Sequence, residues 1–440
     1  MVMGRDSLEP YSHDETPGLK IFPEVVVKPE TREEVLEILR LAHKEKVPVT
    51  PRGGGTGLAG GAVPLSDGIV LSMERMDRIK EIDRENRMAV VEPGVITEDL
   101  SKKVEEYGLF YPPDPASLDS CTLGGNIATG AGGARTVKYG TTRNYVYGLE
   151  VVLPKGELLR LGGKFLKNAT GYSLLHLFIG SEGTLGVFTE AILRLLPKPE
   201  YKVDLLIPYK RLEDAVRTAL RLPLTPTTLE FMERDAIKAA EKFLEKRLPF
   251  SDAEVHLLLE FDGEKEELEK VYERVGEIAL EDGAVDVFVA DNRPSQERIW
   301  EGRRAISRGL KAMGKVASQD VVVPKSRIPE FIDRLRRVRE KYRMKVVCFG
   351  HLGDGNVHVN LIKEREEALN LVPTILKEIF QTVVDLGGII SGEHGIGLVK
   401  KPYLKMALSS PYIQLMRGIK RVFDPNNILN PGKIFDVYTS

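Results

Sequence analysis

Apolar runs and one amphipathic stretch alternate in the first part of the chain. Residues 24–28, 47–50 and 68–72 are apolar runs of strand length, bounded by proline, glycine or charged residues. Residues 31–46 carry apolar side chains at helical spacing, and Thr31-Arg-Glu-Glu34 resembles the capping box that begins many helices. The pattern predicts strand, helix and strand, followed by a loop at the carboxyl end of a strand, where α/β units bind ligands.

The remainder of the first 200 residues has a mixed pattern. Residues 1–20 are polar and predict a mobile lead-in. Residues 111–140 are rich in glycine and proline and weakly periodic, yet contain enough apolar side chains to argue against disorder. We interpret this segment as one threaded along a ligand. The further predicted strands are 88–92, 149–153, 157–161 and 188–196, and the predicted helices are 97–107 and 171–178.

The composition changes after Pro199. Residues 201–390 contain few glycines and alternate strands with charged amphipathic helices, which is typical of an α+β layer with antiparallel strands. A domain boundary is therefore expected near residue 200. The predicted strands are 203–207, 255–261 and 285–290, and the predicted helices are 213–220, 234–244, 265–281 and 296–313.

Composition and charge exclude several classes of protein. The chain of 440 residues has a net charge of −2, which gives no reason to expect binding to nucleic acid or an anionic membrane. No apolar run approaches the roughly 20 residues that a transmembrane helix needs. Cys121 and Cys348 are the only cysteines, so neither a disulfide framework nor a cysteine-built metal cluster is possible. We expect a cytoplasmic protein.

The loop at residues 51–64, PRGGGTGLAGGAVP, is the most unusual stretch of the chain. It holds six glycines and no acidic residue, and its N–H groups are suited to form a concave anion site. Arg52 adds a cation that suits phosphate. Further glycine-rich segments at 124–133 and 180–187 suggest one extended ligand held by backbone. The alternative for the first loop is a flexible surface loop.

Two short polar segments near the carboxyl end predict a metal site. His351 and His358 flank the tight-turn sequence Gly353-Asp-Gly355, and a hairpin there places both imidazoles on one side. With Glu393 they form a three-ligand set for a divalent cation, and His394 is left as a base. The alternative is that these histidines only pair with backbone in turns.

Arginine in the 296–313 helix suggests a contact with an anionic substrate. Arg303 lies beside the only tryptophan, Trp300, and an arginine that faces a cleft binds a carboxylate through two N–H groups. The alternative is a solvated helix face, which Arg304 also fits.

Six motifs in order resemble one family, over nearly the whole chain from Val25 to Phe435. The chain resembles FAD-dependent D-2-hydroxyacid dehydrogenases of the vanillyl-alcohol oxidase / p-cresol methylhydroxylase superfamily, which include D-lactate dehydrogenase, the flavin subunit of glycolate oxidase and D-2-hydroxyglutarate dehydrogenase. The motifs are PRGGGTGLAGG, CTLGGNIATGAGG, GSEGTLGV, GHLGDGNVH, SGEHGIG and FDPNNILNPG.

The resemblance implies an α+β fold with three parts. Residues 1–200 would form a two-subdomain FAD-binding domain of the p-cresol methylhydroxylase type. Residues 201–395 would form an antiparallel, ferredoxin-like substrate domain that carries the metal site. Residues 396–440 would form a helical segment that packs back on the FAD domain.

The resemblance also implies how FAD is held. Residues 52–57 would hold the diphosphate, Glu182, Gly183 and Val187 would touch the adenine end or the flavin edge, and Asn430 would lie beneath the isoalloxazine. Cys121 also occurs in relatives with non-covalent flavin, so we predict dissociable FAD. The implied FAD residues are Arg52, Gly53, Gly54, Gly55, Thr56, Gly57, Pro113, Asp114, Ser117, Gly125, Asn126, Ala131, Gly132, Gly133, Glu182, Gly183, Val187 and Asn430.

At the substrate site the resemblance implies that His351, His358 and Glu393 bind Zn²⁺, Mn²⁺ or Fe²⁺, with His394 as base. Arg303 falls where relatives place an arginine that binds the substrate carboxylate. Ser318 departs from hydroxyglutarate-type enzymes, which carry a lysine near this position for a second carboxylate. A monocarboxylate such as D-lactate is therefore favoured.

We expect oxidation of a small D-2-hydroxy acid, with D-lactate favoured and glycolate or D-2-hydroxyglutarate as alternatives. Electrons would leave to a separate acceptor, such as an iron–sulfur subunit or an electron-transfer flavoprotein, and a partner of this kind is the expected route to any membrane association. The sequence leaves open whether the protein forms a homodimer. The alternatives from other classes are a metal-dependent hydrolase with a nucleotide-binding loop and a non-catalytic flavin-binding subunit.

Overall fold

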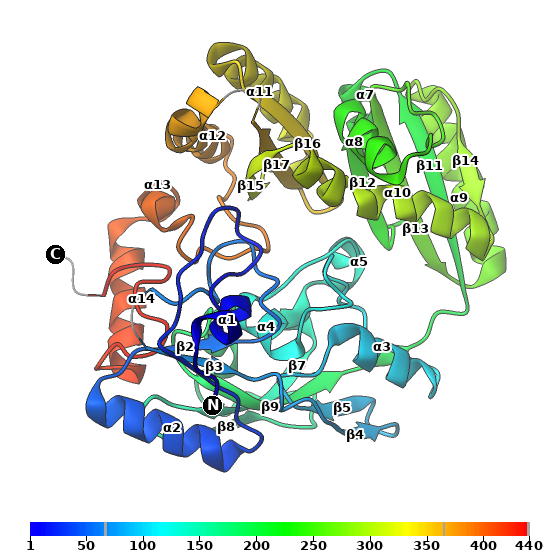
Figure 1. Cartoon of the computed structure of the whole chain (residues 1–440). Coiled ribbons are helices and arrows are strands. Elements are labelled where there is room, and N and C mark those ends of the chain that lie inside the picture. The colour runs from blue at the N-terminus through cyan, green and yellow to red at the C-terminus, as the bar shows by residue number, and fades with distance from the viewer. Residues whose placement is uncertain (66–67, 364–365, 438–440) are drawn as a thin grey trace. The chain divides into compact units, whose positions relative to one another are not determined.

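The computed structural model describes residues 1–65, 68–363 and 366–437, and the chain divides into two compact units. Unit 1 comprises Met1–Gly132, Thr141–Lys198 and the chain from Glu393 onward, and unit 2 comprises Gly133–Gly140 and Pro199–Gly392 (Figure 1). The first boundary lies close to the expected residue 200. The second follows residue 392 rather than 395, and residues 133–140 belong to unit 2 rather than to the first domain.

Unit 1 begins with a small parallel sheet of order β1-β3-β2, formed by β1 (Val25–Val27), β3 (Ile69–Ser72) and β2 (Val49–Arg52). Helix α2 (Arg32–Glu45) connects the first two strands along the chain. Its buried face, Val35, Leu39 and Ala42, packs in one cluster with Val49 and Leu71. Strand β2 therefore ends where the glycine-rich loop begins, as the pattern predicts.

The amino end of α2 is capped, with one departure from the predicted box. The side chain of Thr31 accepts the backbone N–H of Glu34 at 3.3 Å. The carboxylate of Glu34 accepts the N–H of Glu30 at 2.7 Å, one residue before the cap. The cap thus satisfies two backbone donors at the helix start, although not both donors of a capping box.

A second sheet of unit 1 is antiparallel, with the order β4-β5-β9-β7-β8. Its strands are β4 (Ile79–Asp83), β5 (Met88–Val91), β9 (Val187–Arg194), β7 (Val146–Val152) and β8 (Leu158–Gly162). The other elements of this part are α3 (Thr97–Glu105), β6 (Leu109–Phe110), η2 (Thr142–Asn144), α6 (Leu175–Phe178) and β10 (Leu196–Pro197).

The 111–140 segment contains two helices that its weak periodicity does not reveal, α4 (Leu123–Thr129) and α5 (Thr136–Tyr139). The side chain of Thr122 accepts the N–H of Gly125 and so begins α4, and Gly130 ends it in a left-handed conformation with φ of 67°. Caps rather than apolar periodicity define this short helix.

The prediction of a mobile lead-in is wrong. The amino-terminal residues form α1 (Arg5–Leu8) and η1 (Glu9–Tyr11), and Ser12 and Asp14 are buried. The N–H of Glu15 donates to the carbonyl of Gly57 in the glycine-rich loop at 3.0 Å. Contacts with residues far along the chain order this polar segment, and a local pattern does not record such contacts.

The carboxy-terminal segment belongs to unit 1 and contains η5 (Lys401–Tyr403), α13 (Leu404–Ala407) and α14 (Ser410–Phe423). The buried ammonium of Lys420 on α14 donates to the carbonyls of Thr184 at 2.7 Å and Leu429 at 2.8 Å, and it pairs with Asp424. A buried cation is stable here because it is both paired and hydrogen-bonded.

Unit 2 is built on a seven-stranded antiparallel sheet of order β14-β11-β13-β12-β16-β17-β15. Helices α8 and α10 pack against each other, and their side chains share an apolar cluster with β12 and β16 (Figure 1). The strands are β11 (Tyr201–Tyr209), β12 (Thr228–Glu233), β13 (Val255–Gly263), β14 (Phe288–Ala290), β15 (Lys315–Val322), β16 (Lys345–His351) and β17 (Asn356–Ile362). The helices are α7 (Leu212–Arg221), α8 (Arg234–Leu244), α9 (Lys265–Glu281), α10 (Arg293–Ala312), η3 (Lys325–Arg327), α11 (Ile328–Tyr342), η4 (Glu366–Leu371) and α12 (Val372–Asp385).

Among the residues that the structure describes, no helix combines the length and the apolar character that a membrane crossing requires.

Candidate functional site

The glycine-rich loop after β2 lies directly against the second glycine-rich segment. A Cβ at Gly53 would lie 2.3 Å from the hydroxyl oxygen of Thr122, and a Cβ at Gly54 would lie 2.3 Å from the carbonyl of Ser120. Only glycine permits this approach of two backbones. The fold therefore brings two of the three segments singled out in the sequence into contact at the start of α4.

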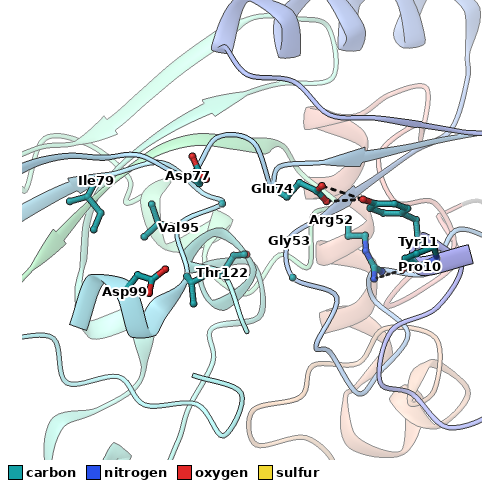
Figure 2. Close-up of a pocket in the computed structure, with 13 residues that line it drawn as sticks. Pro10, Tyr11, Arg52, Gly53, Glu74, Asp77, Ile79, Val95, Asp99 and Thr122 are labelled. Carbon is teal, nitrogen blue, oxygen red and sulfur yellow. Dashed lines mark hydrogen bonds between the residues drawn. The ribbon is translucent and has the colours of Figure 1, made fainter. Parts of the chain in front are cut away.

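A cavity of about 380 Å³ opens beside these glycines in unit 1 (Figure 2). Gly53, Gly54 and Gly94 have no side chain, so they contribute backbone to its wall. The rest includes apolar and acidic side chains. The lining residues are Pro10, Tyr11, Arg52, Gly53, Gly54, Glu74, Asp77, Ile79, Gly94, Val95, Ile96, Asp99 and Thr122.

Arg52 lines this cavity, but its guanidinium donates to the amino-terminal segment. It is 7% exposed, and it donates to the carbonyl of His13 at 2.8 Å. It also donates to the carbonyl of Pro10 at 3.0 Å (Figure 2). Burial lowers the pKa of Arg52, and the nearby Asp14 opposes that effect. The predicted contact with a diphosphate stays a prediction, while the observed hydrogen bonds give Arg52 a structural role.

In the third glycine-rich segment, the carboxylate of Glu182 accepts backbone N–H groups of the Ser391–Gly397 motif. Its oxygens accept from Ile396 at 2.8 Å and Gly397 at 2.7 Å. Burial raises the pKa of Glu182, and these hydrogen bonds oppose that rise. The side-chain amide of Asn430 donates to the carbonyls of Glu182 at 2.8 Å and Gly61 at 2.9 Å, so it links the first and third glycine-rich segments.

Among the other residues expected near FAD, Asn126 and Val187 are buried, and Gly133 lies in the other unit. Asn126 is buried and donates to the hydroxyl of Thr97 at 2.7 Å. Val187 is 2% exposed and packs in the apolar cluster beneath α2, and its contact with FAD stays a prediction. Gly133 belongs to unit 2, whereas most of the implied set belongs to unit 1.

Three further expected positions lie in unit 1. The carbonyl of Ser117 accepts the N–H of Cys121 at 2.7 Å, and the carbonyl of Ala131 accepts the N–H of Thr142 at 3.0 Å. Pro113 is buried. These contacts shape the segment between β6 and β7 and do not by themselves indicate a ligand.

The hairpin predicted from the histidine spacing is observed in unit 2. His351 ends β16, and His358 lies on β17, where it pairs in register with Phe349. The Nε2 atoms of the two imidazoles lie 3.3 Å apart, and both rings are 8% exposed. The turn between them requires Gly355, which has a φ of 84°.

Glu393 completes the set of candidate metal ligands. The preceding residue, Gly392, donates its N–H to the carboxylate of Asp320 on β15 at 2.8 Å, which fixes the chain entering Glu393. One ligand atom each of His351, His358 and Glu393 lies within 4.8 Å of the others. The Nε2 atom of His394 lies 3.8 Å from a carboxylate oxygen of Glu393.

Glu230 is a residue of the candidate site that sequence reasoning missed. It lies on β12, is completely buried, and accepts from Nδ1 of His351 at 2.5 Å. Burial would raise its pKa, but His351 and Arg303 outweigh that effect and lower the pKa to about 2. The available signal was a single acidic residue inside the apolar run of residues 228–232, a run that the sequence analysis did not assign to a strand.

Arg303 contacts Glu230 through two nitrogens. Its Nε lies 2.8 Å and its Nη2 lies 2.5 Å from Oε2 of Glu230, and its guanidinium also stacks over Phe349 at 4.8 Å. A role for Arg303 in binding a substrate carboxylate stays a prediction. Arg304 is more exposed and pairs with Glu297, as a solvated helix face would. The hydroxyl of Ser318 donates to Asn360 at 3.0 Å.

Comparison with protein families assigns both halves of the chain. Residues 23–162 match the family described as FAD binding domain, and residues 198–434 match FAD linked oxidases, C-terminal domain. The chain belongs to the FAD-linked oxidases. This assignment decides against the metal-dependent hydrolase.

Relatives of this FAD-linked oxidase span almost its whole length. The chain is 42% identical to the glycolate oxidase subunit GlcD of Bacillus subtilis, over 97% of this chain and 92% of that protein. It is 43% identical to a D-lactate dehydrogenase of Archaeoglobus fulgidus, over 96% and 95%. Its fold is similar to p-cresol methylhydroxylase, with a TM-score of 0.83 and 19% identity over 100% of this chain and 94% of that one.

The residues of this oxidase fit FAD. Gly53 and Gly54 form a cradle that a Cβ would fill, beside a cavity lined by glycine backbone and by apolar and charged side chains. Cys121 is buried and its thiol lies 3.4 Å from the hydroxyl of Thr97. Dissociable FAD stays a prediction that this buried position of Cys121 supports.

The residues also fit a divalent cation. Two imidazoles and one carboxylate are the donor set that Zn²⁺, Mn²⁺ and Fe²⁺ accept in catalytic sites. Glu230 bonds to Nδ1 of His351 on the side of the ring away from Nε2, which is the usual arrangement around metal-binding histidines. If His351 and His358 had only a structural role in the turn, a buried carboxylate bonded to Nδ1 of His351 would not be needed.

Proposed function

We propose that this FAD-linked oxidase oxidises a small D-2-hydroxy acid to the 2-oxo acid, with D-lactate as the favoured substrate. The observation that carries the proposal is the cluster of His351, His358 and Glu393 in a chain with an FAD-binding domain. The names of its relatives, D-lactate dehydrogenase and a glycolate oxidase subunit, support the same class of substrate. Glycolate and D-2-hydroxyglutarate are the alternatives.

The reaction breaks one O–H bond and one C–H bond of the substrate and forms a C=O bond. When bound, FAD supplies an acceptor for the hydride from the α-carbon, and a divalent cation supplies a positive charge that lowers the pKa of the hydroxyl. His351, His358 and Glu393 would hold that cation. A ring nitrogen of His394 takes the hydroxyl proton, since it lies next in the chain to a ligand and is itself basic.

Ser318 supports a monocarboxylate substrate. It lies on β15 and its short hydroxyl side chain bonds to Asn360, so no cation from this position meets a second carboxylate. The sequence resemblance implies a lysine near this position in hydroxyglutarate-type enzymes. We therefore propose D-lactate or glycolate ahead of D-2-hydroxyglutarate.

We infer that a separate acceptor would take the electrons. The chain has two cysteines, both buried and unpaired, too few for an iron–sulfur cluster of its own. The Bacillus relative is named as a subunit of glycolate oxidase, which supports a partner of this kind.

The test is a panel of D- and L-2-hydroxy acids with an artificial dye as acceptor, run before and after treatment with a chelator. We expect turnover of D-lactate, loss of turnover on chelation, recovery with Zn²⁺ or Mn²⁺, and flavin absorbance near about 450 nm throughout. Full activity in protein shown to be metal-free would contradict the metal assignment. Turnover of L-acids alone would contradict the substrate.

A further inference from the structure

Glu182 connects the GSEGTLG motif to the SGEHGIG motif within unit 1. Both oxygens of its carboxylate accept backbone N–H groups, from Ile396 at 2.8 Å and from Gly397 at 2.7 Å. The side chain is 9% exposed. These two donors follow Glu393 and His394 by two to four positions, so the carboxylate holds the same short loop that carries both residues.

The backbone of the SGEHGIG loop lies in close contact with Glu182. Gly395 has a φ of 81°, and a Cβ there would lie 2.8 Å from Oε1 of Glu182. Gly397 has a φ of 50°, and a Cβ there would lie 2.1 Å from the carbonyl of Ala59. These two glycines allow the backbone to reach the carboxylate, and a side chain at either would separate them.

Glu182 is itself held rigidly. It has the left-handed φ of 52°, its N–H donates to the carbonyl of Ala128 at 2.7 Å, and its carbonyl accepts from the side chain of Asn430. The ammonium groups of Lys400 and Lys433 place positive charge near the carboxylate. Several contacts hold the backbone of Glu182 in an uncommon conformation, and the position of its side chain is therefore fixed as well. A side chain in a fixed position can hold a neighbouring loop in place.

We propose that Glu182 is a positioning residue that fixes Glu393 and His394 by binding the backbone two to four residues beyond them, rather than a contact of the flavin. A carboxylate is needed because each oxygen accepts one N–H. Glutamine offers one acceptor oxygen, and its NH₂ group would face the other N–H. The inference rests on the proposed function only in assigning roles to Glu393 and His394.

The test compares Glu182→Gln with wild-type enzyme, and Glu150→Gln is the matched control. Glu150 is another buried carboxylate of unit 1, and it bonds to Arg160 at 3.0 Å and Thr189 at 3.0 Å. We expect Glu182→Gln to exchange the amide hydrogens of residues 391–399 faster, to bind Zn²⁺ about 10- to 100-fold more weakly, and to retain FAD. Glu150→Gln should leave that exchange and that affinity unchanged.

Unchanged amide exchange in Glu182→Gln would overturn the inference, whether FAD is lost or retained. Wild-type protein that binds no divalent metal and oxidises no 2-hydroxy acid would refute the proposed function instead, while the exchange measurement still decides the anchor. If Glu182→Gln does not fold, Gly395→Ala disturbs the same contact from the loop side. We expect faster exchange and weaker Zn²⁺ binding from it as well, and wild-type behaviour would again overturn the inference.

Discussion

Replacing Arg303 with methionine separates two roles for this arginine. Methionine preserves an unbranched apolar stem but removes both nitrogens that contact Glu230 at 2.8 and 2.5 Å. Glu230 has no exposed surface, so it would remain buried with the imidazole of His351 as its remaining partner among the contacts described. Breaking a buried ion pair from one side costs about 3–5 kcal/mol.

The lowered pKa of Glu230 gives a second estimate of the free energy by which its partners stabilise the fold. Burial raises it, but His351 and Arg303 lower it from the ordinary value of 4.5 to about 2. At neutral pH this difference corresponds to about 3 kcal/mol of stabilisation of unit 2, shared between the two partners. We therefore expect Arg303→Met to lower the free energy of unfolding by about 3 kcal/mol. The double variant Arg303→Met/Glu230→Met should recover part of that loss, because no buried charge is left without its partner.

The assay is urea unfolding followed by tryptophan fluorescence. Trp300 is the only tryptophan, and it lies on α10 with Arg303, so its signal reports the unfolding of unit 2. Arg304→Met, at the neighbouring and more exposed position, is the control and should change stability by less than about 0.5 kcal/mol. A stable Arg303→Met protein with an unchanged unfolding midpoint and a more than about tenfold higher KM would refute this reasoning. It would instead show Arg303 to be a clamp for the substrate carboxylate.

Three further predictions follow from the same geometry. Because the pKa of Glu230 is lowered, its contribution to stability is present above about pH 4.5 and is lost as the pH falls toward about 2. Glu230→Gln should therefore make the stability of the protein less dependent on pH in that window, measured by thermal unfolding at a series of pH values. An unaltered profile would contradict the assignment. His394→Ala should reduce turnover by about 100-fold or more while retaining flavin and metal, checked by dye reduction, absorbance and metal analysis, and near-normal turnover would remove His394 as the base. Gly54→Ala should weaken FAD binding at least about tenfold, since its Cβ would lie 2.3 Å from the carbonyl of Ser120, measured by fluorescence titration of apoprotein. The control is Gly418→Ala, whose Cβ would have no neighbour within 4 Å.

Sequence alone determined the local elements and the residue types of the site. The helix at residues 31–46 and the hairpin of His351 and His358 were predictable because periodicity, caps and tight turns act over a few residues. The glycine-rich loop was recognisable for the same reason, since a backbone that must approach a ligand or another backbone needs glycine at the point of approach.

Tertiary structure decided which residues those elements meet. Glu230 reaches His351 from 121 positions away, and Glu182 reaches Ile396 from 214 positions away. The local sequence does not identify the partner of either glutamate, because each carboxylate is buried by pairing of strands or by loops that are distant in the chain. The amino-terminal segment shows the same limit. Its polar composition resembles a mobile tail, and its hydrogen bonds with Arg52 and Gly57, which lie far along the chain, explain why it is ordered.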